Sequence, residues 1–267
     1  MTAESTSPIR TGTRPRLVLL GASNLTRVGP RLLDDAIACR GAPLEILSAQ
    51  GFGRSYGGRS SVLVRQLPGI LHCGIWEALR ARPAEDTSAL LTDIGNDLLY
   101  EVPVPTIADW IEECLDRLAA HRARIVMTRL PLENLPGLGP LRFRVCRTFT
   151  HPGCRLTLPE ACQRANQLDQ AVQQLGAKYG ATLITPRPEW YGWDPIHIRR
   201  RHWSAAWAEI LAGWKWGPAP EPRPVTPMRR KLQFFFAAAQ QRWLFGHQFH
   251  RAQPCLAWPD GSTLSLY

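Results

Sequence analysis

The sequence predicts an α/β protein, a three-layer αβα sandwich with a central parallel sheet. Short apolar runs alternate with segments of helical periodicity along residues 16–217. Several runs end in glycine or a polar turn, which suits buried parallel strands. This alternation of strand and helix favours a parallel sheet with helices on both of its faces.

Five short apolar runs are the expected strands, at residues 17–20, 44–47, 89–94, 125–127 and 182–184. The connecting segments are expected to be helical. In the clearest of them, residues 106–121, apolar side chains recur at i, i+3 and i+4 spacing. Further helices are expected around Leu32–Ile37 and at residues 60–82, 158–179 and 203–214.

Residues 133–158 interrupt this pattern because they are rich in proline and glycine. We expect an irregular segment there. It could cover a site as a lid, or it could be a surface excursion.

The ends of the chain also differ from the central part. Residues 1–15 are predicted to be a disordered leader, followed by one domain over residues 16–217. Prolines at 218, 220, 222, 224 and 227 predict a stiff linker over residues 218–227. Residues 228–267 are a C-terminal extension, with a helix and then a small hairpin turning at residues 259–262.

An apolar stripe defines the expected helix of the extension: Leu232, Phe235, Phe236, Ala239 and Trp243. We expect this face to dock on its own domain or on a second subunit. Because Arg229, Arg230 and Lys231 precede it, contact with a membrane surface is the less favoured alternative. The sequence leaves the oligomeric state open.

The composition excludes several classes of protein. Of the 267 residues, 45% are apolar and 20% are charged, unlike a wholly disordered, collagen-like or fibrous chain. The seven cysteines contain no CxxC pair, so neither a zinc ribbon nor a compact disulfide framework is indicated. Scattered cysteines are most simply interpreted as reduced thiols. The N-terminus is polar and has no signal-peptide features, and no apolar run approaches the ~20 residues needed to cross a bilayer. Together these observations predict a cytoplasmic protein.

The net charge of +10 favours anionic partners. The positive charge is scattered along the chain and forms no recognised nucleic-acid module, which disfavours nucleic acid as the partner.

Polar residues or a glycine follow four of the expected strands. Ser23 comes after the first strand, Gly53 after the second and Asn96 after the third, while Asp194 and His197 lie in a turn after the fifth. Because the carboxyl ends of parallel strands share one edge of a sheet, we expect these residues to lie together.

These residue types suit nucleophilic catalysis. A serine hydroxyl becomes a good nucleophile when a neutral imidazole takes its proton, and a carboxylate fixes the tautomer of that imidazole. Asp194 and His197 are three positions apart, so one turn could present both, and Pro195 favours such a turn. We therefore expect activity to rise with pH as His197 loses its proton.

The order of these elements resembles the SGNH hydrolases, also called the GDSL esterase/lipase family. That family has a nucleophilic serine in its first motif, an oxyanion-hole glycine in its second, an oxyanion-hole asparagine in a G-x-N-D motif, and a final D-x-x-H motif. By this resemblance, Ser23, Asp194 and His197 would be catalytic. The backbone amides of Ser23 and Gly53 and the side chain of Asn96 would form the oxyanion hole.

The resemblance covers residues 16–216 and implies a flavodoxin-like sandwich. It also implies hydrolysis of a carboxylic ester through an acyl-enzyme, with no metal and no organic cofactor. The substrate would be a small-molecule or carbohydrate ester, as for an esterase, a carbohydrate O-deacetylase, a lipase or a thioesterase. Ala22 replaces the Asp of the family's Gly-Asp-Ser, and Ile198 replaces a proline after the histidine.

Simpler roles are open for the same residues. Ser23 or Asn24 could cap a helix, and so could Asn96 or Asp97, of which we expect Asp97 to be structural. The glycine-rich segment at residues 51–58 does not match a dinucleotide fingerprint, because Tyr56 stands where the third glycine belongs.

Residues beside the candidate site could set its specificity. Arg54 and the run Arg199, Arg200 and Arg201 could favour an anionic substrate, although we expect at least two of the three in the run to be solvated. An aromatic group could stack on a sugar, line an acyl pocket or simply pack: Trp190, Tyr191 and Trp193. The rival function is a non-catalytic binding protein for nucleic acid or another anionic partner on an inert hydrolase fold.

Overall fold

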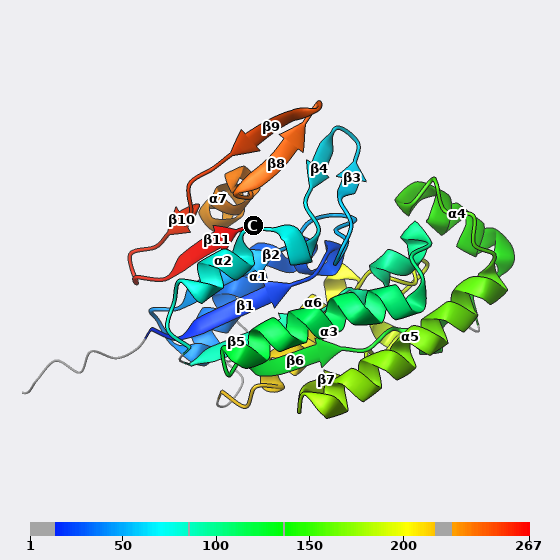
Figure 1. Cartoon of the computed structure of the whole chain (residues 1–267), viewed down its shortest axis with the longest axis horizontal. Helices are drawn as coiled ribbons and strands as arrows, with labels where there is room; N and C mark the ends of the chain where they lie inside the picture. The colour runs from blue at the N-terminus through cyan, green and yellow to red at the C-terminus, as the bar shows by residue number, and fades with distance from the viewer. Residues whose placement is uncertain (1–13, 85, 136, 217–225) are drawn as a thin grey trace, which may run out of the picture.

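The computed structural model describes residues 14–84, 86–135, 137–216 and 226–267. Most of the predicted leader, residues 1–15, and of the predicted linker, residues 218–227, lies outside the described residues. In the described part of the chain, helices cover both faces of a seven-stranded sheet (Figure 1).

The central sheet has the strand order β10-β11-β2-β1-β5-β6-β7. Its main strands are β1 (Arg16–Leu20), β2 (Glu45–Ala49), β5 (Thr87–Leu91), β6 (Arg124–Thr128) and β7 (Thr182–Ile184). These strands pair in parallel in the flavodoxin-like order, with β1 between β2 and β5. The predicted αβα sandwich and its strands are confirmed.

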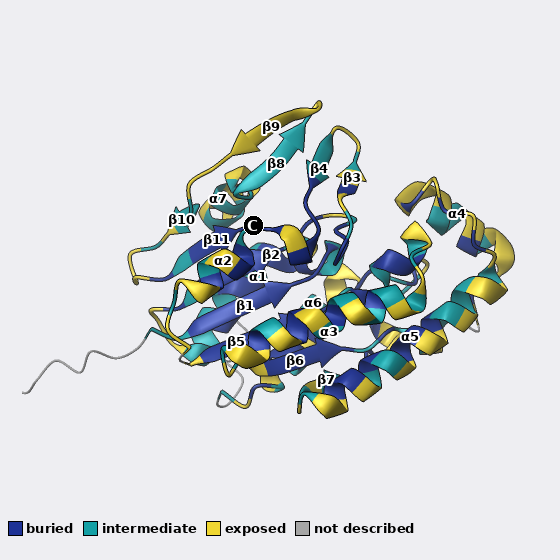
Figure 2. Ribbon diagram, viewed as in Figure 1, coloured by how far each residue is buried: buried dark blue, intermediate teal, exposed yellow. Residues whose placement is uncertain are grey.

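The side chains of β1 pack into two separate hydrophobic cores, one on each face of the sheet. Leu17 and Leu19 pack with α1 (Ser23–Arg40) and α6 (Trp203–Ala212). Val18 and Leu20 face the other layer, which consists of α2 (Ile75–Arg80), α3 (Val104–Ala120) and α5 (Leu158–Lys178). Because successive side chains of a strand point to opposite faces, a wholly apolar strand must be covered on both sides. Figure 2 shows these buried strands between helices that are exposed on their outer faces.

The described residues also include short 3₁₀ helices: η1 (Ile70–His72), η2 (Ile94–Tyr100), η3 (Leu132–Asn134), η4 (Pro188–Trp190) and η5 (Arg200–His202). Within the ranges given above, none of the helices combines the length and the apolar character needed to span a bilayer.

Two segments differ from the sequence-based prediction. Residues 60–82 were expected to be helical, but they begin with a hairpin of β3 (Ser60–Val62) and β4 (Arg65–Leu67). The β-branched Val62 in β3 favours that strand conformation. Residues 133–158 were expected to be irregular, but they contain α4 (Pro140–Thr150), in which proline occupies a first-turn position where no amide donor is needed.

The C-terminal extension is built into both sheets. After α7 (Met228–Phe236), strands β8 (Gln241–Leu244) and β9 (His247–His250) extend the β3–β4 hairpin into a second sheet of order β3-β4-β8-β9. Strands β10 (Leu256–Ala257) and β11 (Thr263–Leu266) form the expected hairpin. Strand β11 then pairs in parallel with β2 at the edge of the central sheet.

The apolar stripe expected in the extension is only partly helical. Helix α7 ends at Phe236, and Trp243 lies in β8. Phe235 and Phe236 are 79% and 68% exposed, so the expected face does not dock on the domain. The prediction failed because three consecutive phenylalanines leave the docking face of the helix undetermined.

Phe234 makes the docking contact instead. Its ring packs against Gly29 in the middle of α1, where an added Cβ would lie 2.2 Å from the Phe234 Cζ atom. Arg230 pairs with Asp34 of the same helix at 2.8 Å. The extension therefore docks on its own domain, as expected, but through a different residue.

Replacement of Gly29 by alanine should lower the melting temperature by roughly 2–6 °C. Alanine is the better helix former by about 1 kcal/mol, but here its Cβ would collide with the Phe234 ring. Thermal unfolding followed by circular dichroism measures the effect. In a Phe234→Ala background the same substitution should be neutral or stabilising, and an equal loss in both backgrounds would contradict the contact.

Candidate active site

The residues singled out in the sequence gather at the carboxyl edge of the central sheet. Ser23 is the first residue of α1, just after β1, and Gly53 follows β2. Asn96 lies in η2 after β5, with Ile94 at the glycine position of the G-x-N-D pattern. Asp194 and His197 lie in a turn after β7 and η4.

Ser23, His197 and Asp194 form a hydrogen-bonded row. His197 Nε2 lies 2.8 Å from Ser23 Oγ, and His197 Nδ1 lies 2.5 Å from Asp194 Oδ2. When the ring proton is on Nδ1, Nδ1 donates a hydrogen bond to the Asp194 carboxylate. Nε2 is then free to accept the proton of the Ser23 hydroxyl. His197 is buried, whereas Ser23 is half-buried and lines a cavity.

Asp194 also holds the turn that carries it. Its Oδ1 accepts the amides of Ile196 at 3.1 Å and of His197 at 3.3 Å, a common turn-forming pattern for aspartate. Burial alone would raise the pKa of Asp194, but the hydrogen bond and charge of His197, with smaller effects of Ile196 and Arg27, lower that pKa below its ordinary value. The carboxyl group is therefore ionised at neutral pH and can accept from Nδ1.

Asp93 anchors the start of α1, a role that the sequence interpretation missed. Its Oδ2 accepts the amides of Ala22 at 2.8 Å and of Asn24 at 3.1 Å. Backbone amides at a helix N-terminus stabilise a nearby negative charge. In the sequence, Asp93 fell inside the expected strand at residues 89–94, so nothing indicated a partner for its carboxylate.

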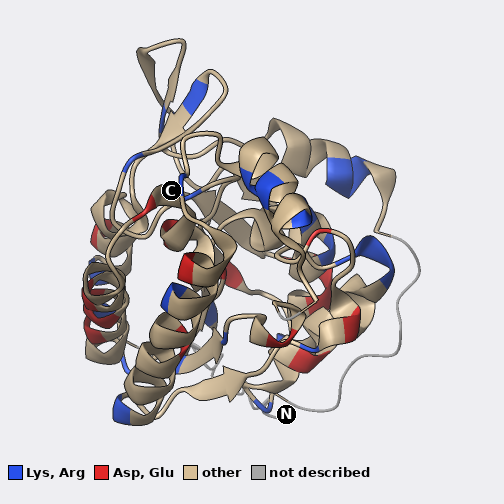
Figure 3. Ribbon diagram, turned by 90° about the vertical axis from the view of Figure 1, so that its right-hand side faces the viewer, with Lys and Arg blue, Asp and Glu red and all other residues tan. Residues whose placement is uncertain are grey.

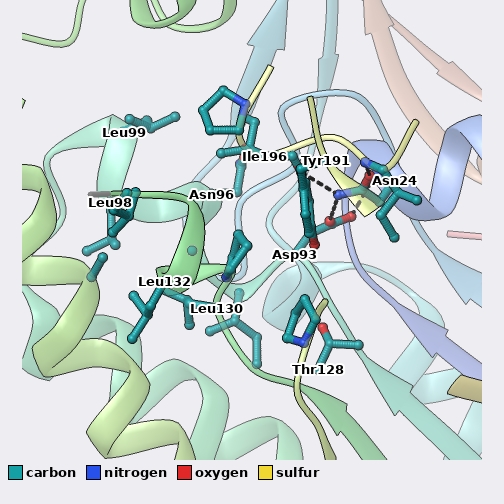
Figure 4. Close-up of a pocket in the computed structure, with 18 of the residues that line it drawn as sticks. Asn24, Asp93, Asn96, Leu98, Leu99, Thr128, Leu130, Leu132, Tyr191 and Ile196 are labelled. Atoms are coloured by element: carbon teal, nitrogen blue, oxygen red, sulfur yellow. Dashed lines mark hydrogen bonds between the residues drawn. The ribbon is translucent and has the colours of Figure 1, made fainter. Parts of the chain in front are cut away.

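Asn24 connects this anchor to the His197 turn (Figure 4). Its Nδ2 donates to Asp93 Oδ1 at 2.7 Å and to the Ile196 carbonyl at 2.9 Å. Its Oδ1 accepts the amide of Ile198 at 2.9 Å. Both neighbours of His197 in the chain are thus fixed to the residue after Ser23, so Asn24 is a bridge between segments and not a helix cap.

Two backbone amides and one side-chain amide are available as donors near Ser23. Among the hydrogen bonds of the described residues, the Ser23 and Gly53 N–H groups have no acceptor, although Asp93 accepts the amides on either side of Ser23. Asn96 Nδ2 donates one proton to the Arg54 carbonyl at 3.0 Å, which leaves its second proton for another acceptor.

The segment around Gly53 is fixed by its neighbours. Gly53 has a φ of +64°, a conformation that favours glycine, and its carbonyl accepts the Tyr100 hydroxyl at 2.6 Å. Arg54 is fully buried and donates to the carbonyls of Gln50 and Tyr267. The expectation that Arg54 meets an anionic substrate is therefore wrong, because its guanidinium points into the protein.

Asp97 is structural, as expected. It is fully buried, and its Oδ2 accepts the amide of Tyr56 at 2.8 Å. Burial raises the pKa of Asp97 to about 6, and hydrogen bonds from Ser55 and Tyr56 oppose that increase. The carboxyl group holds the segment that follows Gly53.

His151 is a second histidine near the site, and the sequence interpretation did not single it out. It lies at the end of α4 and packs edge-to-face on Tyr100, with ring centroids 4.7 Å apart. Burial, and less strongly the charge of His197, lower the pKa of His151 to about 4, so its ring is neutral at pH 7. Within the described residues, neither of its ring nitrogens has a hydrogen-bond partner.

A cavity of about 160 Å³ opens beside Ser23 (Figure 4). Ser23, Asn24, Asp93 and Asn96 give it one polar side. The rest of the wall is mostly apolar, with Leu98, Leu130, Leu132, Leu135, Leu138 and Phe143 among its residues. Residues 133–158 therefore contribute a wall of this cavity and are not a separate surface excursion.

The flanking aromatic and basic residues have different surroundings. Trp190 and Tyr191 are buried and line the cavity, whereas Trp193 is 61% exposed. All three arginines of the run after His197 are exposed, which confirms the expectation that this run is mostly solvated: Arg199, Arg200 and Arg201.

No family model and no curated protein matches the sequence. Solved structures do resemble the chain. An esterase, EstA, from Pseudoalteromonas sp. is 15% identical, with a TM-score of 0.49, over 75% of this chain and 96% of its own. TesA is 15% identical, with a TM-score of 0.47, over 75% and 98%. A putative SGNH hydrolase from Slackia heliotrinireducens is 13% identical, with a TM-score of 0.47, over 77% and 100%. At this distance, the assignment of function depends on the geometry of the site itself.

The substitution Asp97→Asn should change how stability depends on pH. The pKa of Asp97 is about 6 in the folded state, against 3.8 for an ordinary aspartate. Because the folded state holds the proton more tightly, the free energy of unfolding of the wild type falls by about 3 kcal/mol as pH rises through that interval. The variant has no such loss, so its stability relative to wild type should increase over the same interval. Urea unfolding at pH 4 and pH 7 measures the difference, and a pH-independent difference would contradict a buried titrating carboxyl.

Proposed function

We propose that the protein hydrolyses carboxylic esters through an acyl-enzyme on Ser23. The observation that carries this proposal is the hydrogen-bonded row from Ser23 Oγ through His197 to Asp194, with distances of 2.8 Å and 2.5 Å. It joins residues 174 positions apart in the chain. The order of motifs that resembles the SGNH hydrolases supports the same three roles.

In the first step, His197 Nε2 removes the proton from the Ser23 hydroxyl as Oγ attacks the ester carbonyl. Asp194 stabilises the imidazolium that forms and keeps the ring in place. The imidazolium then gives its proton to the departing alcohol. Ser23 is left acylated, and the first product leaves.

In the second step, water replaces the alcohol. His197, again neutral, takes a proton from the water as its oxygen attacks the acyl carbon. The acid product leaves, and the proton returns to Ser23 Oγ. The reaction needs only the neutral form of His197 and the ionised form of Asp194 at its start.

The negative oxygen of each tetrahedral intermediate needs donors. We assign this role to the N–H groups of Ser23 and Gly53 and to Asn96 Nδ2. The first two have no acceptor among the described residues, and Asn96 has a second proton to give. Because these donors are fixed before the reaction, they stabilise the developing charge without reorganisation.

The cavity supports a short acyl group. A volume of about 160 Å³ is close to that of an apolar cavity of about 150 Å³ that holds a benzene-sized molecule. Its largely apolar wall suits an acetyl, butyryl or benzoyl group better than a long fatty acyl chain. The leaving alcohol would be that of a small molecule or a carbohydrate.

The wild type should hydrolyse p-nitrophenyl acetate, and Ser23→Ala should lower kcat/KM by at least roughly 10³-fold. The exposed serine of α6, in Ser204→Ala, is the matched control and should have no effect. Release of p-nitrophenol measures both. If Ser23→Ala kept wild-type activity while folded, the assignment would be wrong.

Removal of the Asn96 side chain in Asn96→Ala should lower kcat by about 10²–10³-fold with a smaller change in KM, because the lost donor acts mainly in the transition state. Asn166→Ala, at an exposed position of α5, is the control. The same ester assay, with thermal unfolding to show that the variant is folded, tests this. A rise in KM with unchanged kcat would assign Asn96 to ground-state binding instead.

A further inference from the structure

The second sheet carries a surface with no role in the proposed reaction. We call residues 59–67 and 241–250 the arm. In it, β4 pairs with β8 and two hairpins lie side by side. The arm projects from the body of the molecule in two perpendicular views (Figures 1 and 3).

The two hairpin tips are apolar and exposed. Leu63 is 97% exposed, Val64 46% and Phe245 77%. The Phe245 amide donates to the Val64 carbonyl at 2.9 Å, so the tips are in contact and present one surface. Exposed apolar side chains that adjoin one another are a mark of an interaction site.

The backbone makes these residues still more unusual. Leu63 and Phe245 have φ values of +52° and +50°, in the left-handed region where turns normally use glycine, asparagine or aspartate. Both tips thus keep a large apolar side chain where a small polar one would suit both the backbone and water better. This combination points to a binding role for the side chains themselves.

The arm is also positively charged without compensation. Residues 46–76 and 226–259 contain no Asp or Glu. Arg59 stacks on Trp243 with its guanidinium carbon 4.2 Å from the ring centroid. Burial, and less strongly the positive charge of nearby Arg242, lower the pKa of Arg65, which means that these two like charges repel each other. An anion placed between or beside them would relieve this repulsion.

We propose that the arm docks on an anionic lipid surface, with Leu63, Val64 and Phe245 inserted among the acyl chains and the arginines against the phosphate groups. Two of the three tip residues, Leu63 and Val64, are aliphatic, which favours a lipid phase over nucleic acid, whose bases stack on aromatic or guanidinium planes. A second copy of this chain is disfavoured, because it would bring the same positive charge opposite. Trp243, two positions before Phe245, is of a residue type that is enriched at bilayer interfaces.

The arm borders the candidate active site. A Cβ added at Gly53 would lie 3.1 Å from Val62 Cγ2 in β3, so the strand touches the segment that we assign to the oxyanion hole. Docking of the arm would therefore hold the candidate site close to the lipid surface. The binding itself does not depend on the esterase function.

Sedimentation of the full chain with vesicles tests the proposal. We expect binding to vesicles of phosphatidylcholine with roughly one third phosphatidylglycerol, weak binding to phosphatidylcholine alone, and a decrease with added salt. The double substitution Leu63→Asn and Phe245→Asn should weaken binding by roughly 10-fold or more. Asparagine suits the positive φ at both positions, so the fold should be kept.

A matched control uses the same residue types elsewhere. Leu141→Asn and Phe149→Asn replace residues of α4 that are 67% and 85% exposed, and should leave binding unchanged. For the charges, Arg59→Gln with Arg242→Gln should weaken binding by roughly 5-fold for each arginine. The exposed pair Arg144→Gln and Arg155→Gln is the corresponding control.

Other outcomes would overturn the proposal. These are no binding of the wild type to either vesicle, or equal losses in the tip and control variants. Binding of a single-stranded RNA in a fluorescence anisotropy assay, lost in the arm variants while vesicles fail to bind, would make the arm a nucleic-acid surface. A dimer in light scattering that the tip substitutions dissociate, again without vesicle binding, would make it an interface between copies.

Discussion

The candidate site depends on the hydrogen bonds that the Asp93 carboxylate accepts. This carboxylate accepts amides at the start of α1 and, through Asn24, fixes the turn that carries His197. The carbonyl of the same residue accepts the Asn96 amide at 3.1 Å. Asp93 has a φ of +58°, which aspartate tolerates better than most residues. One residue after a central strand therefore sets the relative positions of Ser23, Asn96 and His197.

The C-terminal extension supports the site from another direction. Strand β11 adds to the central sheet beside β2, and the Tyr267 carbonyl after it accepts the buried Arg54 guanidinium. The Arg54 carbonyl in turn accepts the Asn96 side chain. Hydrogen bonds thus run from the extension to the segment of Gly53. The second sheet adds contact with that segment through Val62, so much of the extension bears on the geometry of the site.

Local patterns allowed the sheet and the order of the site residues to be predicted, because apolar runs and the residues after them are visible in the sequence. Contacts between distant segments were not visible: the Asn24–Ile196 hydrogen bond joins residues 172 positions apart. The β3–β4 hairpin was missed because it is completed by β8, which is far along the chain. Arg54 was misplaced because a sequence does not show whether a side chain next to a site points toward it or into the core.

The proposed reaction requires that Ser23 is a nucleophile activated by His197 and Asp194. The most direct measurement is the intact mass of the protein after treatment with a fluorophosphonate, followed by peptide mapping of the modified residue. We expect a single adduct on Ser23, none on Ser23→Ala, and greatly slowed labelling of His197→Ala. An unlabelled, folded wild type, or an adduct that persists in Ser23→Ala, would contradict the proposed reaction.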